Sequence, residues 1–193
     1  MNAVLPIRMT VDEFLLWSQQ QDSGRYELER GQVVLMSPQN VGHAKTKARV
    51  FSALDAAIAR SGLPLYALPD GMTIRIPGAR AYEPDALVAA LPEPAAASLE
   101  VADPIVVIEV MSPSASSMRR DLQAKVVGYA LVPSIEHYII IDPADRVVLH
   151  YRRRGDLLVP PEVPTEGTLR LDPPGLTIPI AELLIPAGST EVT

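Results

Sequence analysis

Apolar and polar residues recur along this chain with two periods, one helical and one extended, and the switches between them predict the order of elements. A short first helix is predicted in "VDEFLLWSQQ", because Thr10 and Glu13 form a capping box at its start. A second helix is predicted from Gly42 to about Arg60, where apolar residues recur at helical spacing and Gly62 follows as the C-cap.

A period of two predicts strands between and after these helices. "RYELERGQVVLMSP" is typical of a hairpin that turns at Arg30 and Gly31, and strands are expected at about 64–68 and 72–76. Further strands are predicted in "YEPDALVAA", "IVVIEV", "HYIIID" and "RVVLHYRR", and a helix in "SMRRDLQAKVVGYALV". The last forty residues hold seven of the 19 prolines and predict short edge strands with a turn near "PIAELL". The predicted fold is a single α/β domain over residues 1–193, with a central mixed β-sheet flanked by helices.

Composition supports a globular protein. A chain of 193 residues, 48% of them hydrophobic, is long enough to bury one sizeable core. No apolar run approaches the roughly 18 residues needed to cross a bilayer, so no membrane association is expected. The start, "MNAVLPIRMT", lacks a secretion signal, and without cysteine there are no disulfides or thiolate metal sites. Both features are consistent with a cytoplasmic protein.

The formal net charge of −6 disfavours non-specific binding to a polyanion, since such binding comes almost wholly from neutralising phosphates. A nucleic-acid partner would therefore have to bind at local basic clusters, each of which is more commonly a solvated face. The candidate clusters are Lys45 with Lys47 and Arg49, Arg119 with Arg120, and residues 152–154.

One carboxylate, Glu109, stands in the otherwise apolar stretch "IVVIEVMSPS", residues 105–114. Apolar residues on both faces are expected for a central strand that is covered on each side. An unpaired buried charge costs on the order of several kcal/mol, so burial by chance is an expensive explanation. Glu109 also lies near the end of its strand, where ligand sites form in open sheets. We therefore predict that Glu109 belongs to a functional site.

Two further residues are predicted to approach Glu109. Asp85 begins the strand "DALVA", a candidate neighbour of the 105–110 strand. The carboxylates of Asp85 and Glu109 would then repel each other unless a cation holds them or one keeps a proton. Lys125 lies on the following helix at the edge of its apolar stripe, and so toward the sheet. A surface pair with Asp121 is the alternative for this lysine. The stripe consists of Met118, Leu122, Val126 and Tyr129.

"EPD", followed 24 residues after its aspartate by "IEV", resembles the PD-(D/E)XK nuclease signature. More closely, the chain resembles the Uma-type family of "putative restriction endonucleases" built on that core. A single "PD" would carry no weight, but an ordered set of segments from about residue 26 to 152 is specific. The matching segments are "YELERG", "MSP" with His43, "YEPDALV", "IVVIEVMSPS", "RRDLQAKVVGYA" and "IEHYIIIDP".

The chain departs from the broad nuclease signature at one position. The signature places its lysine two residues after the glutamate, where this chain has Met111. The Uma-type pattern takes the lysine from the following helix, and Lys125 matches it there. In the hairpin, Arg30 and Gln32 flank Gly31 where the family often has an acidic pair, and Glu27 matches the family's acidic position.

The resemblance implies hydrolysis of DNA phosphodiester bonds with Mg²⁺ or Mn²⁺, hard cations that prefer oxygen ligands. It implies Asp85 and Glu109 as carboxylate ligands of the metal, with the Val110 carbonyl as a third ligand. Lys125 would orient the attacking water or neutralise charge in the transition state. Glu27 would bind a second metal ion or a water at the first.

The remaining polar residues leave alternatives open. His43 is either a phosphate contact or proton shuttle, or a cap or surface histidine, and the sequence favours neither. His137 and His150 are predicted as ordinary strand residues, and Tyr129 as a core residue.

Three functions remain open from the sequence. The first is an active, metal-dependent DNA endonuclease. The second is a catalytically silent nuclease-fold module that binds nucleic acid or regulates, as a homodimer. The third is a small-molecule hydrolase that uses the same metal carboxylates.

Overall fold

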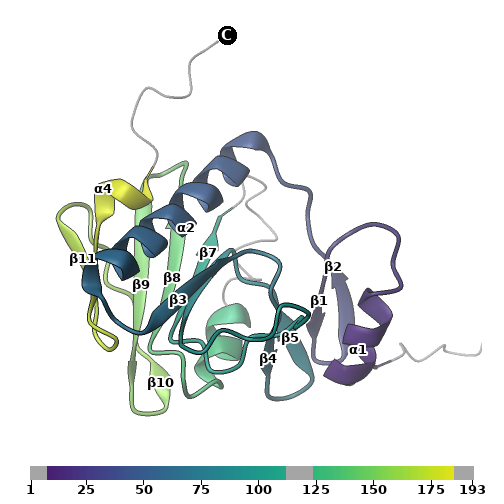
Figure 1. Ribbon diagram of the computed structural model, residues 1–193. Helices are drawn as coiled ribbons and strands as arrows, with labels where there is room; N and C mark the ends of the chain where they lie inside the picture. The colour runs from purple at the N-terminus through teal and green to yellow at the C-terminus, as the bar shows by residue number, and fades with distance from the viewer. Residues whose placement is uncertain (1–7, 112–123, 185–193) are drawn as a thin grey trace, which may run out of the picture.

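The computed structural model describes residues 8–111 and 124–184 (Figure 1). A helical segment at residues 124–130 adds to the named elements. In chain order these are α1 Val11–Ser18, β1 Tyr26–Glu29, β2 Gln32–Leu35, α2 Val41–Ser61, β3 Leu65–Pro69, β4 Ile74–Ile76, β5 Arg80–Tyr82, β6 Ala86–Ala90, β7 Val106–Val110, β8 His137–Asp142, β9 Val147–Arg154, β10 Leu157–Leu158, β11 Thr168–Leu171, β12 Leu176–Pro179 and α4 Ile180–Leu183.

The central sheet has six strands in the order β10-β9-β8-β7-β6-β3. Strands β7 and β8 pair in parallel and the other neighbours are antiparallel, so the predicted mixed sheet is confirmed. The predicted hairpin is also present as β1 and β2, but it belongs to a separate sheet of order β2-β1-β5-β4 that the sequence did not indicate. The late strands β11 and β12 pair with each other and not with an edge of the central sheet.

Two apolar layers enclose the central sheet. On one face, Val50 and Leu54 of α2 pack with Ile108 of β7, and the β11–β12 hairpin and α4 join the same cluster. Figure 1 shows α2 crossing this face of the sheet. On the other face, Val107 packs in a second cluster with Tyr129 of the segment 124–130. Each fully buried aliphatic side chain contributes about 2 kcal/mol, so β7 is held firmly between the layers.

Helix α2 has clear sequence-encoded ends. The Asn40 side chain accepts a hydrogen bond from the His43 backbone N–H, and Gly62 ends the helix with a left-handed φ of 65°. His43 and Lys47 stand four residues apart and therefore on one side of the helix, and both are buried. In the described part of the chain, no helix combines the length and the apolar character needed to cross a bilayer.

His137 on β8 and His150 on β9 form a buried pair, which the sequence did not predict. Their Nδ1 and Nε2 atoms lie 2.8 Å apart, and His137 Nε2 lies 2.7 Å from the Pro173 carbonyl oxygen. Because a carbonyl only accepts, His137 carries its proton on Nε2, and His150 donates to His137 Nδ1. This arrangement needs His137 to be neutral, because its Nδ1 has to accept a hydrogen bond. Burial lowers the pKa of His137, and burial, with His137 and Arg152 adding to it, lowers the pKa of His150 to about 4.

Acid should therefore destabilise the fold through this pair. Unfolded histidine has a pKa of about 6.5, so below that pH the unfolded chain binds a proton that folded His150 does not. We expect the free energy of unfolding, measured by urea titration, to fall by about 2 kcal/mol between pH 7 and pH 5 through His150. A His150→Gln variant, which keeps a donor toward His137, should lose less over the same interval. Equal losses in both proteins would remove His150 as the cause.

Candidate active site

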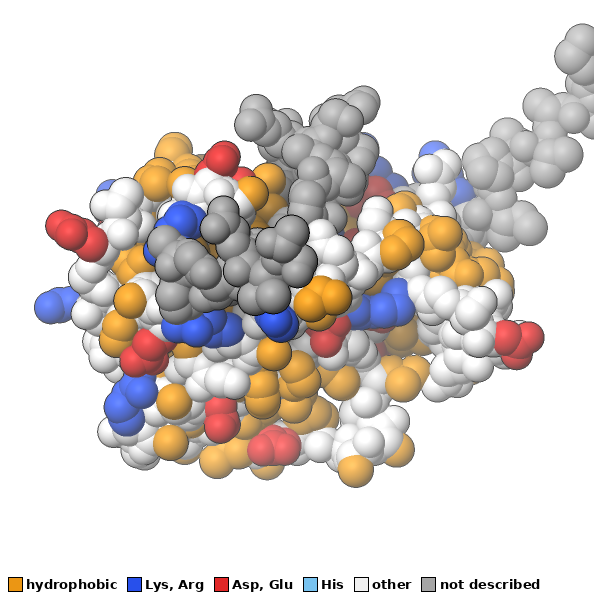
Figure 2. Space-filling model, turned by 90° about the horizontal axis from the view of Figure 1, so that it is seen from above, with side chains coloured by type: hydrophobic (Ala, Val, Ile, Leu, Met, Phe, Trp, Pro, Cys, Tyr) orange, Lys and Arg blue, Asp and Glu red, His pale blue; other side chains and the backbone are white. Residues whose placement is uncertain are grey.

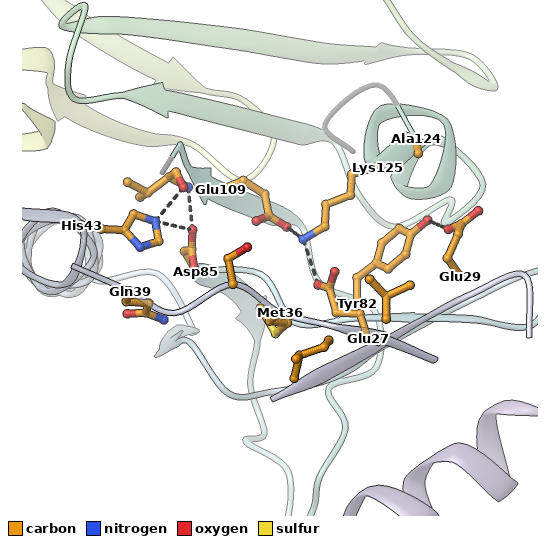
Figure 3. Close-up of a pocket in the computed structure, with 14 residues that line it drawn as sticks. Glu27, Glu29, Met36, Gln39, His43, Tyr82, Asp85, Glu109, Ala124 and Lys125 are labelled. Atoms are coloured by element: carbon orange, nitrogen blue, oxygen red, sulfur yellow. Dashed lines mark hydrogen bonds and ion pairs between the residues drawn. The ribbon is translucent and has the colours of Figure 1, made fainter. Parts of the chain in front are cut away.

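Four chain segments meet around a cavity of about 210 Å³ at the end of β7. The hairpin β1–β2 provides Glu27, the residue before β6 is Asp85, β7 provides Glu109, and the segment 124–130 provides Lys125. Figure 3 shows Lys125 between the carboxylates of Glu27 and Glu109, with Asp85 close by. The structure thus brings together the four residues that the sequence singled out.

Lys125 bridges two carboxylates that are far apart in the sequence. Its Nζ lies 2.8 Å from Glu27 Oε1 and 2.8 Å from Glu109 Oε1, and only 13% of its side chain is exposed. The burial of Lys125 excludes the alternative in which it is a surface residue. Its suggested partner Asp121 lies outside the described residues, and so do Met118 and Leu122 of the predicted stripe. Glu27 Oε1 also accepts a 2.9 Å hydrogen bond from the Glu83 backbone N–H.

Close packing at Gly128 sets the position of Lys125. A Cβ added at Gly128 would lie 2.6 Å from the ring of Tyr82, so only glycine allows this approach. The Lys125 Nζ lies 5.6 Å from the centre of the same ring. A glycine in a predicted helix was the available sequence signal for this close contact.

The buried carboxyl of Glu109 has two hydrogen-bond donors. Besides Lys125, the Tyr129 hydroxyl donates to Glu109 Oε1 at 2.8 Å, so the predicted core residue Tyr129 is buried and also contacts the site. Burial raises the pKa of Glu109 to about 7; Lys125 opposes this shift, and Asp85 and Glu27 reinforce it. Burial alone would lower the pKa of Lys125, but Glu109 and Glu27 more than offset it and raise that pKa above its usual value.

Asp85 has a different set of partners. Its Oδ2 accepts a 2.6 Å hydrogen bond from the Val110 backbone N–H, which fixes the carboxylate against the end of β7. Its Oδ1 lies 2.7 Å from Lys47 Nζ, and Lys47 also lies 2.5 Å from Asp70 Oδ2. Burial alone would raise the pKa of Asp70, but Lys47 and Arg25 lower it below its usual value. The interpretation of Lys47 as part of a solvated basic face is therefore wrong, because it is buried.

His43 lines the same cavity. Its ring nitrogen Nε2 lies 2.7 Å from the Val110 carbonyl oxygen and 3.8 Å from Asp85 Oδ2. Because the carbonyl only accepts, Nε2 carries the proton in this contact. His43 Nδ1 is buried and has no hydrogen-bond partner among the described residues. The helix cap is Asn40, so the cap or surface interpretation of His43 is wrong; a phosphate contact stays a prediction.

Some members of the predicted basic clusters make structural contacts. Arg49 donates to backbone carbonyls of Ala181 and Glu182, and Arg152 pairs with Glu162. On the face seen in Figure 2, Lys and Arg side chains lie mixed with Asp and Glu. Arg119 and Arg120 lie outside the described residues. Basic character near the site therefore rests, within the described part, on buried lysines rather than on an exposed patch.

The donor set at this cavity suits a hard divalent cation. Oxygen atoms lie at one end of two neighbouring strands, from Asp85, Glu109 and the Val110 carbonyl. The carbonyl oxygen has two lone pairs, so it can accept a second partner besides His43. Among residues 8–111 and 124–184, no three His, Asp or Glu side chains have the spacing of a formed metal site. Mg²⁺ commonly takes one or two carboxylates and keeps several waters, so two carboxylates and a carbonyl are enough.

Comparison with known proteins identifies the family of this chain and a structure that shares its fold. A family model described as "Putative restriction endonuclease" (Uma2) matches residues 11–181, most of the chain. The chain belongs to the Uma2 family. A crystal structure from Anabaena variabilis, described as "a putative nuclease belonging to DUF820", shares the fold with a TM-score of 0.70. It is 17% identical and the match covers 91% of this chain and 97% of that one. A search of curated proteins found no match.

Within this Uma2-family chain, the one departure from the broad nuclease signature has a structural explanation. Met111, at the position of the expected lysine, packs against the apolar cluster that contains Tyr129. The ammonium group reaches Glu109 from the segment 124–130 instead, through Lys125. Family membership supports a nuclease.

Proposed function

We propose that this protein is a metal-dependent endonuclease that hydrolyses DNA phosphodiester bonds. The observation that carries the proposal is the buried Lys125 ammonium, which lies between Glu27 and Glu109 on the wall of a cavity that also contains Asp85. Two carboxylates at neighbouring strand ends can hold a divalent cation, and a lysine beside them can stabilise negative charge on a phosphate. The family description supports the same reaction class.

Asp85, Glu109 and the Val110 carbonyl would hold Mg²⁺ or Mn²⁺. The charge of the site supports one such ion, because three carboxylates at the site are in contact with only two ammonium groups. The carboxylates are Glu27, Asp85 and Glu109, and the ammonium groups are Lys47 and Lys125. When bound, the ion would supply a Lewis acid for the phosphate and lower the pKa of a water.

The side chains of the protein contribute orientation and charge. With a carboxylate on each side, Lys125 is held as an ammonium, so its role is to stabilise negative charge on the phosphate rather than to remove a proton. Glu27 positions Lys125 and is itself fixed by the Glu83 N–H. The Tyr129 hydroxyl fixes the orientation of Glu109. Because these contacts exist before substrate binds, little reorganisation is required during the reaction.

The test is a cleavage assay with supercoiled plasmid, run together with calorimetric titration of Mn²⁺ into the metal-free protein. We expect Mn²⁺ to bind with about one ion per site and nicked or linear plasmid to form only with Mn²⁺ or Mg²⁺ present. Chelation by EDTA should stop the reaction. Cleavage that persists in EDTA, or the absence of any Mn²⁺ binding, would contradict the proposal.

A silent nuclease-fold module is the second candidate, favoured by one observation. Asp85 and Glu109 already contact Lys47 and Lys125, so both proposed ligands are neutralised without a metal. Tight duplex binding in a gel-shift assay, with no cleavage at any Mn²⁺ concentration, is the result that this candidate predicts.

A further inference from the structure

Lys47 is the buried cation that neither the family resemblance nor the proposed reaction uses. Only 5% of this residue is exposed, and its ammonium lies between two carboxylates, 2.7 Å from Asp85 Oδ1 and 2.5 Å from Asp70 Oδ2. Lys125 occupies the equivalent position between Glu27 and Glu109. The site therefore contains two separate carboxylate–lysine–carboxylate bridges, and Asp85 belongs to the one made by Lys47.

An ammonium and a divalent cation would compete at Asp85. The Val110 N–H occupies Oδ2 at 2.6 Å and orients the carboxylate, while Lys47 occupies Oδ1. A metal ion at this carboxylate would lie within a few ångströms of Lys47 Nζ, where two positive charges repel by several kcal/mol at an effective dielectric constant of about 20. Both cations cannot keep the same contact with Asp85.

Asp70 offers the ammonium a second anchor. It is already the nearer of the two carboxylates to Lys47, and Arg25 holds it at 2.6 Å independently of Asp85. A cavity of about 310 Å³ is lined by Lys47, Asp70 and Asp85, so there is space beside the bridge for a small shift. Lys47 can therefore leave Asp85 without becoming an unpaired buried charge, which would cost several kcal/mol, roughly.

We propose that Lys47 is the resident cation of the Asp85 carboxylate, and that a divalent metal ion binds by taking its place while Asp70 retains the displaced ammonium. This proposal rests on the proposed function, because it assumes that Asp85 is a metal ligand. It makes Lys47 a determinant of metal affinity, and it explains why a metal-binding carboxylate can stay buried in the metal-free protein.

The first test is calorimetric titration of Mn²⁺ into variants of the full chain. Lys47→Met should bind Mn²⁺ roughly ten- to a hundredfold more tightly than the wild type, because no ammonium has to be displaced. Asp70→Asn should bind it roughly tenfold more weakly, because the displaced ammonium loses its second anchor. Lys45→Met is the matched control: Lys45 lies on the exposed side of the same helix, so its loss should leave the affinity nearly unchanged.

The second test observes the ammonium directly, and it separates displacement from simple repulsion at a distance. In ¹H–¹⁵N spectra of the lysine ammonium groups, the Lys47 signal is assigned in the wild-type protein by through-bond correlation from its side-chain carbons to its backbone amide. Its protons should exchange with water faster once Mg²⁺ saturates the site, because the Asp85 contact is lost. This measurement uses the wild-type protein, so it holds even where Lys47→Met folds poorly.

The outcomes distinguish the two proposals. Failure of the wild type and Lys47→Met alike to bind Mn²⁺ overturns the metal site, and the displacement with it. Binding by the wild type that Lys47→Met does not improve, or ammonium exchange that Mg²⁺ does not change, overturns only the role of Lys47. Tighter binding by Lys47→Met together with faster exchange supports the displacement.

Discussion

Replacing Asp85 with asparagine should abolish Mn²⁺ binding at concentrations that saturate the wild type and lower plasmid cleavage about a thousandfold. The Val110 N–H bond to residue 85 can persist, because an amide oxygen also accepts a hydrogen bond, so the end of β7 keeps its geometry. The negative charge that would hold the cation is lost. A metal ion supplies several kcal/mol of transition-state stabilisation, and about 4 kcal/mol corresponds to a thousandfold in rate.

The matched control for this variant is Asp55→Asn, which removes the same charge from an exposed position on α2. It should bind Mn²⁺ and cleave plasmid as the wild type does. Calorimetry and a single-turnover assay, run on both variants at the same ionic strength, measure the two effects. Wild-type Mn²⁺ affinity in Asp85→Asn would exclude this carboxylate as a ligand.

Replacing Lys125 with methionine should leave Mn²⁺ binding intact and lower the rate of cleavage by roughly 10²–10³, the cost of removing one preorganised donor to developing negative charge. The metal ligands Asp85 and Glu109 are unchanged in this variant, and the loss of a nearby positive charge does not oppose cation binding. The measurement is a single-turnover cleavage rate at saturating Mn²⁺, with the affinity measured by calorimetry. An unchanged rate would remove Lys125 from the mechanism.

The same substitution should also lower stability in the metal-free state. Without Lys125, Glu27 and Glu109 face each other uncompensated, and breaking a buried pair in this way costs about 3–5 kcal/mol. Thermal unfolding should show a decrease that Mn²⁺ partly reverses, since the cation binds only the folded protein. Lys45→Met, with the same loss of charge at an exposed position, should change neither stability nor cleavage.

The two lysines are distinguished by the rate of cleavage. Each contacts a proposed metal ligand, Asp85 or Glu109, so removing either one should not weaken metal binding. Lys125 lines the cavity at the end of β7 and Lys47 does not, so only the loss of Lys125 is expected to lower the rate at saturating Mn²⁺. Measuring affinity and rate on both variants therefore distinguishes a residue that regulates occupancy of the site from one that acts in the reaction.

Local patterns in the sequence were sufficient to predict most of the order of helices and strands. The capping box at Thr10 and Glu13, and the left-handed C-cap at Gly62, lie where they were predicted. Such signals work because they depend on hydrogen bonds and backbone angles within about one helical turn. The four-stranded sheet was missed because β5 has only three residues and pairs with β1 far away in the sequence, which no local period reveals.

The sequence by itself determined which acids stand out: Glu109, because a carboxylate in an apolar strand is costly, and Asp85, because it begins the neighbouring strand. Only the tertiary structure decided their partners. Lys125 contacts Glu27 across 98 residues, and His43 contacts Val110 across 67. In the sequence, Lys47 belongs to a basic cluster that is typical of an exposed face, but in the structure it is buried between Asp70 and Asp85. The physical reason is that hydrophobic periodicity is local, whereas the pairing of buried charges depends on which distant segments the core brings together.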